Sequence, residues 1–162
     1  MTSDVRGDVK ELSDLLIKKG LTLSLAESCT GGLVAKYMTD MQGASVFFKG
    51  GAITYSNDSK ERLLNVPRDT IEKCGAVSAR TAEGMAKGVR TIFGTDIAAS
   101  ATGIAGPDGG TDMKPVGTVF IAVTDGKRTE SERLTLKGTR DDIRNETARR
   151  LIRMLIRTIN DI

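Results

Sequence analysis

The sequence contains no histidine, and this absence narrows the available chemistry more than any other feature of its 162 residues. Without histidine there is no Ser-His-Asp or Cys-His nucleophile pair and no histidine-ligated metal site. Only two cysteines are present, Cys29 and Cys74, and they form no CxxC pair, which argues against a disulfide framework or a zinc cage. We therefore expect free thiols, no metal and no cofactor, and catalysis must use another base.

Long apolar runs and a strong charge excess are also missing. No run approaches the roughly 18 to 20 apolar residues that cross a bilayer, and the N-terminal MTSDVRGDVK lacks the apolar middle of a signal peptide. We therefore expect a cytoplasmic protein without a membrane partner. The net charge of +3, with 4% aromatic residues and no tryptophan, gives little support for nucleic-acid binding.

The length and composition predict one folded domain over residues 1–162. Hydrophobic residues make up 39% of the chain and charged residues 28%, with only three prolines, so a single core can form. Only the polar residues 1–7 are expected to be flexible.

Apolar periodicity predicts alternating helices and strands. Helical spacing is found at 8–19, 33–41, 57–64, 78–93 and 139–159. Strands are predicted at 21–26, 50–55, 97–101, 118–123 and 129–137, the last as a sheet edge. This order predicts an α/β fold of three α/β/α layers, with a mixed sheet of about five strands.

Two glycine-rich loops, AESCTGG at 26–32 and ATGIAGPDGG at 101–110, each follow a predicted strand. Ligands bind at the carboxyl ends of strands in open α/β sheets, and glycine lets backbone N–H groups approach an anion. Gly31 and Gly32 in the first loop, and Gly103 and Gly106 in the second, are therefore candidate binding residues. Neither loop has a Walker A or GxGxxG pattern, which disfavours an ATPase or a dehydrogenase, and a purely connecting role is the alternative.

Ser28 is the candidate nucleophile, because it lies between a strand and a helix start, where the N–H groups of residues 29–32 can steady an oxyanion. The alternative is an N-cap serine. With no histidine, the remaining base is a lysine with a lowered pKa. Lys60, in YSNDSK at 55–60, lies one turn into the next helix and can meet Ser28, although most lysines are merely solvated.

Three further residues are candidates for the site, and two of them, Cys29 and Tyr55, have a second interpretation. Cys29 is an alternative nucleophile, because a helix N-terminus lowers the pKa of a thiol. Its second interpretation is a small buried residue without a chemical role. Tyr55 can orient a substrate oxygen or belong to the core. Arg140, in the first turn of the last helix, is a candidate for a bidentate phosphate contact, whereas the later arginines of that helix fit a solvated face.

Five motifs in order resemble the C-terminal domain of CinA, the competence/damage-inducible family, from about residue 8 to the C-terminus. They are AESCTGG, GGAITYSNDSK, GAVS at 75–78, TGIAGPDGG and KPVGTV at 114–119. The resemblance implies a nicotinamide-nucleotide amidohydrolase (NMN deamidase), a hydrolase of pyridine nucleotide salvage and NAD metabolism. Such an enzyme converts nicotinamide mononucleotide to nicotinate mononucleotide and ammonia.

The same resemblance implies roles for individual residues. It makes Ser28 the nucleophile and Lys60 the base of Ser-Lys catalysis. It also implies that other residues contribute to the site: Tyr55, Ser45, Thr102 and Arg140, with backbone N–H groups near Thr30, Gly31 and Gly32 or in the second loop holding the oxyanion.

In the implied mechanism, neutral Lys60 takes the Ser28 proton, an acyl-enzyme and ammonia form, and water hydrolyses the ester. The pKa of Lys60 must then fall from about 10.4 towards about 7 to 8, which needs burial or a nearby cation such as Arg140.

Two other functions stay open at this point. One is a nucleotide-binding regulatory domain without turnover. The weaker one is nucleic-acid binding through the arginine-rich last helix. A homo-oligomer paired through that helix or the 129–137 edge also stays open.

Overall fold

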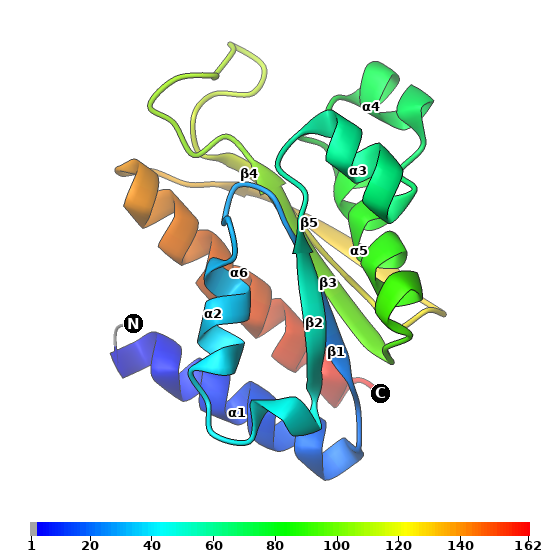
Figure 1. Ribbon diagram of the computed structural model, residues 1–162. Coiled ribbons are helices and arrows are strands. Elements are labelled where there is room, and N and C mark those ends of the chain that lie inside the picture. Colours follow the sequence, from blue (N-terminus) through cyan, green and yellow to red (C-terminus); the bar gives the residue numbers. More distant parts are fainter. Residues whose placement is uncertain (1–2) are drawn as a thin grey trace.

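The structure is a computed structural model that describes residues 3–162. A central sheet separates two layers of helices (Figure 1). The strands are β1 (Leu23–Glu27), β2 (Phe48–Ile53), β3 (Ile97–Gly103), β4 (Thr118–Thr124) and β5 (Thr129–Thr135). The helices are α1 (Ser3–Lys19), α2 (Leu33–Thr39), η1 (Ala44–Val46), α3 (Asn57–Leu64), α4 (Arg68–Cys74), α5 (Ala79–Phe93) and α6 (Arg140–Asn160).

The sheet is mixed, with the strand order β2-β1-β3-β4-β5. β1 is parallel to both of its neighbours, β2 and β3, whereas β4 and β5 continue the sheet as antiparallel strands. The carboxyl ends of β1, β2 and β3 therefore meet at one edge, where the chain leaves each strand towards a helix or a loop.

The two faces of the sheet are covered by different helices. α1, α2 and α6 lie on one side, and α5 lies on the other with α3 and α4 packed against it (Figure 1). Along β1, Leu23 and Leu25 join the core beneath the first layer, whereas Ser24 and Ala26 face α5. Because side chains alternate along a strand, the next two residues, Glu27 and Ser28, continue to opposite faces.

The structure confirms the three-layer fold with a mixed five-stranded sheet. It also confirms the predicted helix ends at 78 and 139: Ser78 caps α5, and Thr139 caps α6 in a reciprocal capping box with Asp142. The polar short helix α4 had no predicted bounds, because Ile71 is its one buried residue and gives no periodicity.

The N-terminal prediction differs from the structure. Helix α1 begins at Ser3 and not at Asp8, and Val5 within it is 6% exposed. Residues 3–7 thus belong to a packed helix, where a flexible end was expected, because one apolar residue among polar neighbours is a weak signal. Residues 1–2 lie outside the described part of the chain.

A close helix–helix approach seats α3, which carries Lys60, on α5. A Cβ atom at Gly88 would clash with the carbonyl oxygen of Leu64, whereas one at Gly84 would lie 3.4 Å from Val66 Cγ1, an ordinary contact. We expect Gly88→Ala to destabilise the fold by about 1 to 3 kcal/mol and Gly84→Ala to stabilise it by up to about 1 kcal/mol through helix propensity. Urea denaturation of both variants tests this, and equal effects would contradict it.

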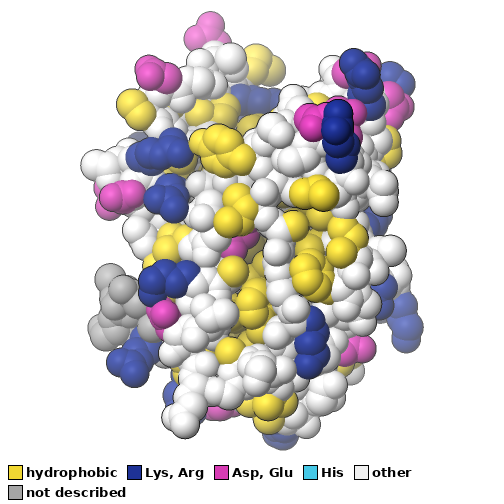
Figure 2. Space-filling model, viewed as in Figure 1, with side chains coloured by type: hydrophobic (Ala, Val, Ile, Leu, Met, Phe, Trp, Pro, Cys, Tyr) yellow, Lys and Arg dark blue, Asp and Glu magenta, His cyan; other side chains and the backbone are white. Residues whose placement is uncertain are grey.

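The two sheet edges differ in character. β5 carries Glu130, Glu132 and Arg133, as expected for a protected edge. On the other edge, apolar side chains gather over β2 and α3 (Figure 2). Ile53 at the end of β2, Tyr55 after it and Leu63 near the end of α3 are more than half exposed. None of the described helices is long and apolar enough to span a membrane.

Candidate active site

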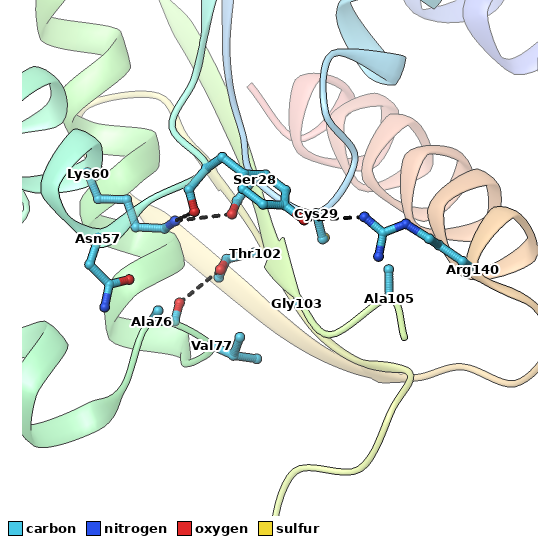
Figure 3. Close-up of a pocket in the computed structure, with 11 residues that line it drawn as sticks. Ser28, Cys29, Asn57, Lys60, Ala76, Val77, Thr102, Gly103, Ala105 and Arg140 are labelled. Carbon is cyan, nitrogen blue, oxygen red and sulfur yellow. Dashed lines mark hydrogen bonds between the residues drawn. The ribbon is translucent and has the colours of Figure 1, made fainter. Parts of the chain in front are cut away.

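A pocket of about 220 Å³ opens at the carboxyl edge of the parallel strands. Its walls come from both glycine-rich loops, from the segment between β2 and α3, and from the start of α6 (Figure 3). The lining residues are Ser28, Cys29, Tyr55, Asn57, Lys60, Ala76, Val77, Thr102, Gly103, Ala105 and Arg140. Segments far apart in the sequence thus converge at the edge that the loops predicted.

Ser28 follows directly after β1 in a tightly held turn. Its N–H donates to the carbonyl of Ala101 at 3.0 Å, and its own carbonyl accepts from the N–H of Gly31 at 3.1 Å. Gly31 and Gly32 have φ of +60° and +94°, which other residues rarely adopt. Gly32, not Ser28, is the N-cap residue of α2, so the N-cap interpretation of Ser28 is wrong.

Lys60 lies one turn into α3, and its side chain points back towards Ser28 (Figure 3). The residue is 1% exposed, so the solvated interpretation is wrong. Its Nζ lies 3.1 Å from Ser28 Oγ and donates to the carbonyl oxygens of Thr54 at 2.7 Å and Tyr55 at 3.3 Å.

The surroundings of Lys60 make its charged form less favourable than in water. Burial lowers its pKa, although the nearby Cys29 opposes this shift. Among the described residues, no carboxylate forms an ion pair with Nζ. Nζ donates to Ser28 Oγ and to the two carbonyl oxygens. In the neutral amine, two N–H groups remain for the carbonyl oxygens and the lone pair can accept from the Ser28 hydroxyl. The arrangement therefore allows Nζ to accept the Ser28 proton. The pKa of Lys60 is lowered by burial and not by a neighbouring cation.

This buried lysine should leave a signature in the pH dependence of stability. The folded pKa lies below the ordinary 10.5. The contribution of Lys60 to stability is then complete above pH 10.5 and is lost as the pH falls towards the folded pKa, because only the unfolded chain binds the proton there. Relative to Lys60→Met, the wild type should lose up to about 1.4 kcal/mol per pH unit in that window.

Urea denaturation of the wild type and of Lys60→Met across this range measures the difference. Lys18→Met, on an exposed position of α1, controls for the loss of a surface lysine. A difference between wild type and Lys60→Met that does not change with pH would contradict the prediction.

Cys29, next to the serine, is not suited to act as the nucleophile. The residue is 5% exposed, and burial raises the pKa of its thiol to about 12. The thiol is therefore protonated near neutral pH, and the effect of burial outweighs the helix N-terminus from which a lower pKa was expected.

Tyr55 and Arg140 both line the pocket. Figure 3 shows the Arg140 side chain reaching from α6 towards Cys29. Tyr55 is 63% exposed, so it is not a core residue, and its hydroxyl accepts from Arg140 Nη2 at 3.2 Å. Arg140 Nη1 also donates to the carbonyl of Gly106 at 2.7 Å, which links α6 to the second glycine-rich loop. Across the pocket, the Thr102 hydroxyl donates to the carbonyl of Ala76 at 2.8 Å.

Several predicted residues lie outside the pocket. Ser45 is in η1, before β2 begins, and the six residues of β2 separate it from the pocket by about 20 Å. The N–H groups of Gly31 and Gly32 donate to the Ser28 carbonyl and to Glu27 Oε2, so they are not free for an oxyanion. The N–H groups of Cys29 and Thr30 lie against the Cys29 sulfur, where they lower the pKa of the thiol.

The sequence did not point to five residues at or beside the site. Asn57, Ala76, Val77 and Ala105 line the pocket, and they belong to the YSNDSK, GAVS and TGIAGPDGG motifs. Glu27 is a buried acid next to Ser28, and its position inside AESCTGG was the available signal. Among the described residues, no three cysteine, aspartate or glutamate side chains gather as ligands for a metal ion.

Comparison with known proteins decides the family. The model of the CinA C-terminal domain matches residues 7–159. The chain belongs to this family. A CinA-like protein of Geobacter sulfurreducens is 53% identical over 134 residues, which is 83% of this chain and 32% of that protein. A CinA-like protein of Dictyoglomus thermophilum is 53% identical over 131 residues, or 81% of this chain and 32% of the relative.

Solved CinA structures have the same fold over their whole length. A CinA superfamily protein of Klebsiella pneumoniae is 30% identical with a TM-score of 0.94, covering 98% of this chain and 99% of the other. The competence/damage inducible protein CihA of Agrobacterium tumefaciens is 36% identical with a TM-score of 0.94, covering 99% and 98%. This CinA domain spans about a third of the length of the curated relatives it matches, 32% in the Geobacter case.

Proposed function

We propose that this CinA domain is a nicotinamide-nucleotide amidohydrolase that converts nicotinamide mononucleotide to nicotinate mononucleotide and ammonia. The observation that carries the proposal is the buried pair of Ser28 Oγ and Lys60 Nζ at 3.1 Å, at the floor of a pocket. A lysine with a lowered pKa is one of the few bases that can activate a serine in a chain without histidine.

The reaction begins with proton transfer from Ser28 to neutral Lys60 as Oγ attacks the carboxamide carbon. The tetrahedral intermediate collapses when protonated Lys60 returns the proton to the amide nitrogen, which leaves as ammonia and leaves an ester on Ser28. Water then attacks the ester carbon and gives a proton to Lys60. Lys60 passes this proton to Oγ as the ester bond breaks, which restores the Ser28 hydroxyl and the neutral amine and releases the acid product, which ionises in water.

The remaining residues suit recognition of a phosphorylated substrate. The pocket is smaller than the about 300 to 1,000 Å³ of most ligand pockets, so it suits the nicotinamide end while the ribose phosphate extends to the mouth. There Arg140 offers a guanidinium to the phosphate, next to the Tyr55 hydroxyl.

Ammonia release from nicotinamide mononucleotide by the purified protein, with a chelator present, tests this function. Turnover that persists in the chelator supports the proposal. A folded protein that binds the nucleotide without releasing ammonia would favour the alternative, a nucleotide-binding regulatory domain, and would contradict the amidohydrolase.

A further inference from the structure

Glu27 is a buried carboxylate for which the proposed reaction has no direct use. It ends β1, is 2% exposed and immediately precedes Ser28. Its carboxylate faces α2, whereas the Ser28 hydroxyl faces α3, as strand alternation requires. Among the described residues, the hydrogen-bond donors to this carboxylate are all backbone N–H groups.

These donors form the start of α2. Glu27 Oε2 accepts from the N–H groups of Gly32 at 2.9 Å and Val34 at 3.2 Å, and Oε1 accepts from that of Ala35 at 2.8 Å. They are donors that a helix leaves unpaired at its N-terminus. α2 has no side-chain cap at Gly32 and no acidic residue in its first turn. A carboxylate from the preceding strand therefore caps it, favoured by the helix dipole and charge-assisted bonds.

The turn that this carboxylate closes contains the nucleophile. Residues 28–32 connect Glu27 to α2, whose start the Glu27 carboxylate caps. Arg144 also contacts this turn, because its guanidinium donates to the Thr30 carbonyl at 2.9 Å. The main chain of Glu27 reaches the base as well. Its carbonyl accepts from the Thr54 N–H at 2.9 Å, and the Thr54 carbonyl accepts from Lys60 Nζ at 2.7 Å.

The geometry points to Glu27 as a positioning residue that holds the Ser28 turn on the start of α2 and keeps Ser28 Oγ within reach of Lys60 Nζ. This inference rests on the proposed role of the Ser28–Lys60 pair. Glu27 does not line the pocket, so its loss should slow the reaction of Ser28 and leave substrate binding nearly unchanged.

The test is the rate at which an alkyl fluorophosphonate labels Ser28, followed by the mass of the intact protein. Glu27→Gln keeps the shape but replaces one acceptor oxygen with an NH2 group that cannot accept. Its labelling rate constant should fall about ten- to a hundred-fold, the scale expected for a misplaced reacting group, while the endpoint stays at one label per chain. Glu11→Gln, exposed on α1, is the matched control and Ser28→Ala the blank.

A Glu27→Gln labelling rate within about twofold of wild type would overturn the inference. A lower final number of labels per chain at an unchanged rate would also overturn it, because this result means that part of the protein is misfolded and the rest reacts normally. Glu27→Asp, which keeps the charge at the helix start but reaches less far, serves if the glutamine variant does not fold, and it too must be slower than wild type. If the wild type releases no ammonia from the nucleotide but Glu27→Gln is still labelled more slowly than the wild type, the positioning role is supported and the proposed substrate is rejected.

Discussion

Lys60→Arg is expected to lower kcat for ammonia release by at least about a thousandfold, the upper range of a lost general base. Arginine carries a positive charge and does not give up its proton in proteins, so it cannot accept one from Ser28. Lys60 is buried and donates to two carbonyl oxygens, which limits how far a replacement can move away from the serine. Steady-state ammonia release at several pH values measures the effect.

The matched control is Lys114→Arg, because Lys114 also donates to a carbonyl beside the pocket, that of Cys74 at 3.0 Å, without contacting Ser28. It should stay within about threefold of wild type, since a surface cation is kept. If Lys60→Arg retained more than a tenth of the wild-type rate while Lys114→Arg behaved the same, Lys60 would not be the base.

Ser28→Ala is expected to reduce kcat by about a thousandfold or more, with the dissociation constant of the nucleotide changed less than about threefold. The alanine removes only Oγ, which accepts a hydrogen bond from Lys60 Nζ. Isothermal titration separates the loss of turnover from a loss of binding. Loss of both together would mean that Ser28 binds the substrate and does not react with it.

Cys29→Ala is the companion to this variant, because Cys29 is the adjacent residue and lines the same pocket. Its thiol has a pKa raised to about 12 by burial, so its removal should leave kcat within about threefold of wild type. A large loss in Cys29→Ala beside an active Ser28→Ala would assign the nucleophile to the cysteine.

Local patterns in the sequence predicted most of the helices and strands. Ser78 and Thr139 are side-chain caps at true helix starts, and the glycine-rich loops follow true strands. Helix caps and strand periodicity depend on neighbours a few residues apart, so a single sequence reports them well. The predicted order of strands then placed Ser28 and Lys60 at the same edge of the sheet, so the sequence predicted that they lie close together.

The burial of Lys60 could not be predicted in the same way, because it depends on α5 and on the carbonyls of Thr54 and Tyr55, which only the folded chain brings around the amine. Ser45, which the family resemblance implied as a site residue, lies in η1 at the opposite end of β2 from the pocket. In the sequence, Glu27 differs from the other acidic residues only in its place within AESCTGG. Only the fold shows that it is buried and accepts hydrogen bonds from backbone N–H groups.

The most direct test of the Ser28–Lys60 mechanism is a rapid-quench experiment with nicotinamide mononucleotide, followed by mass spectrometry of the peptide that contains Ser28. The mechanism predicts an ester of nicotinate mononucleotide on Ser28 that forms and decays during turnover and does not form in Lys60→Arg. Ammonia released without any adduct, together with full turnover by Ser28→Ala, would contradict it.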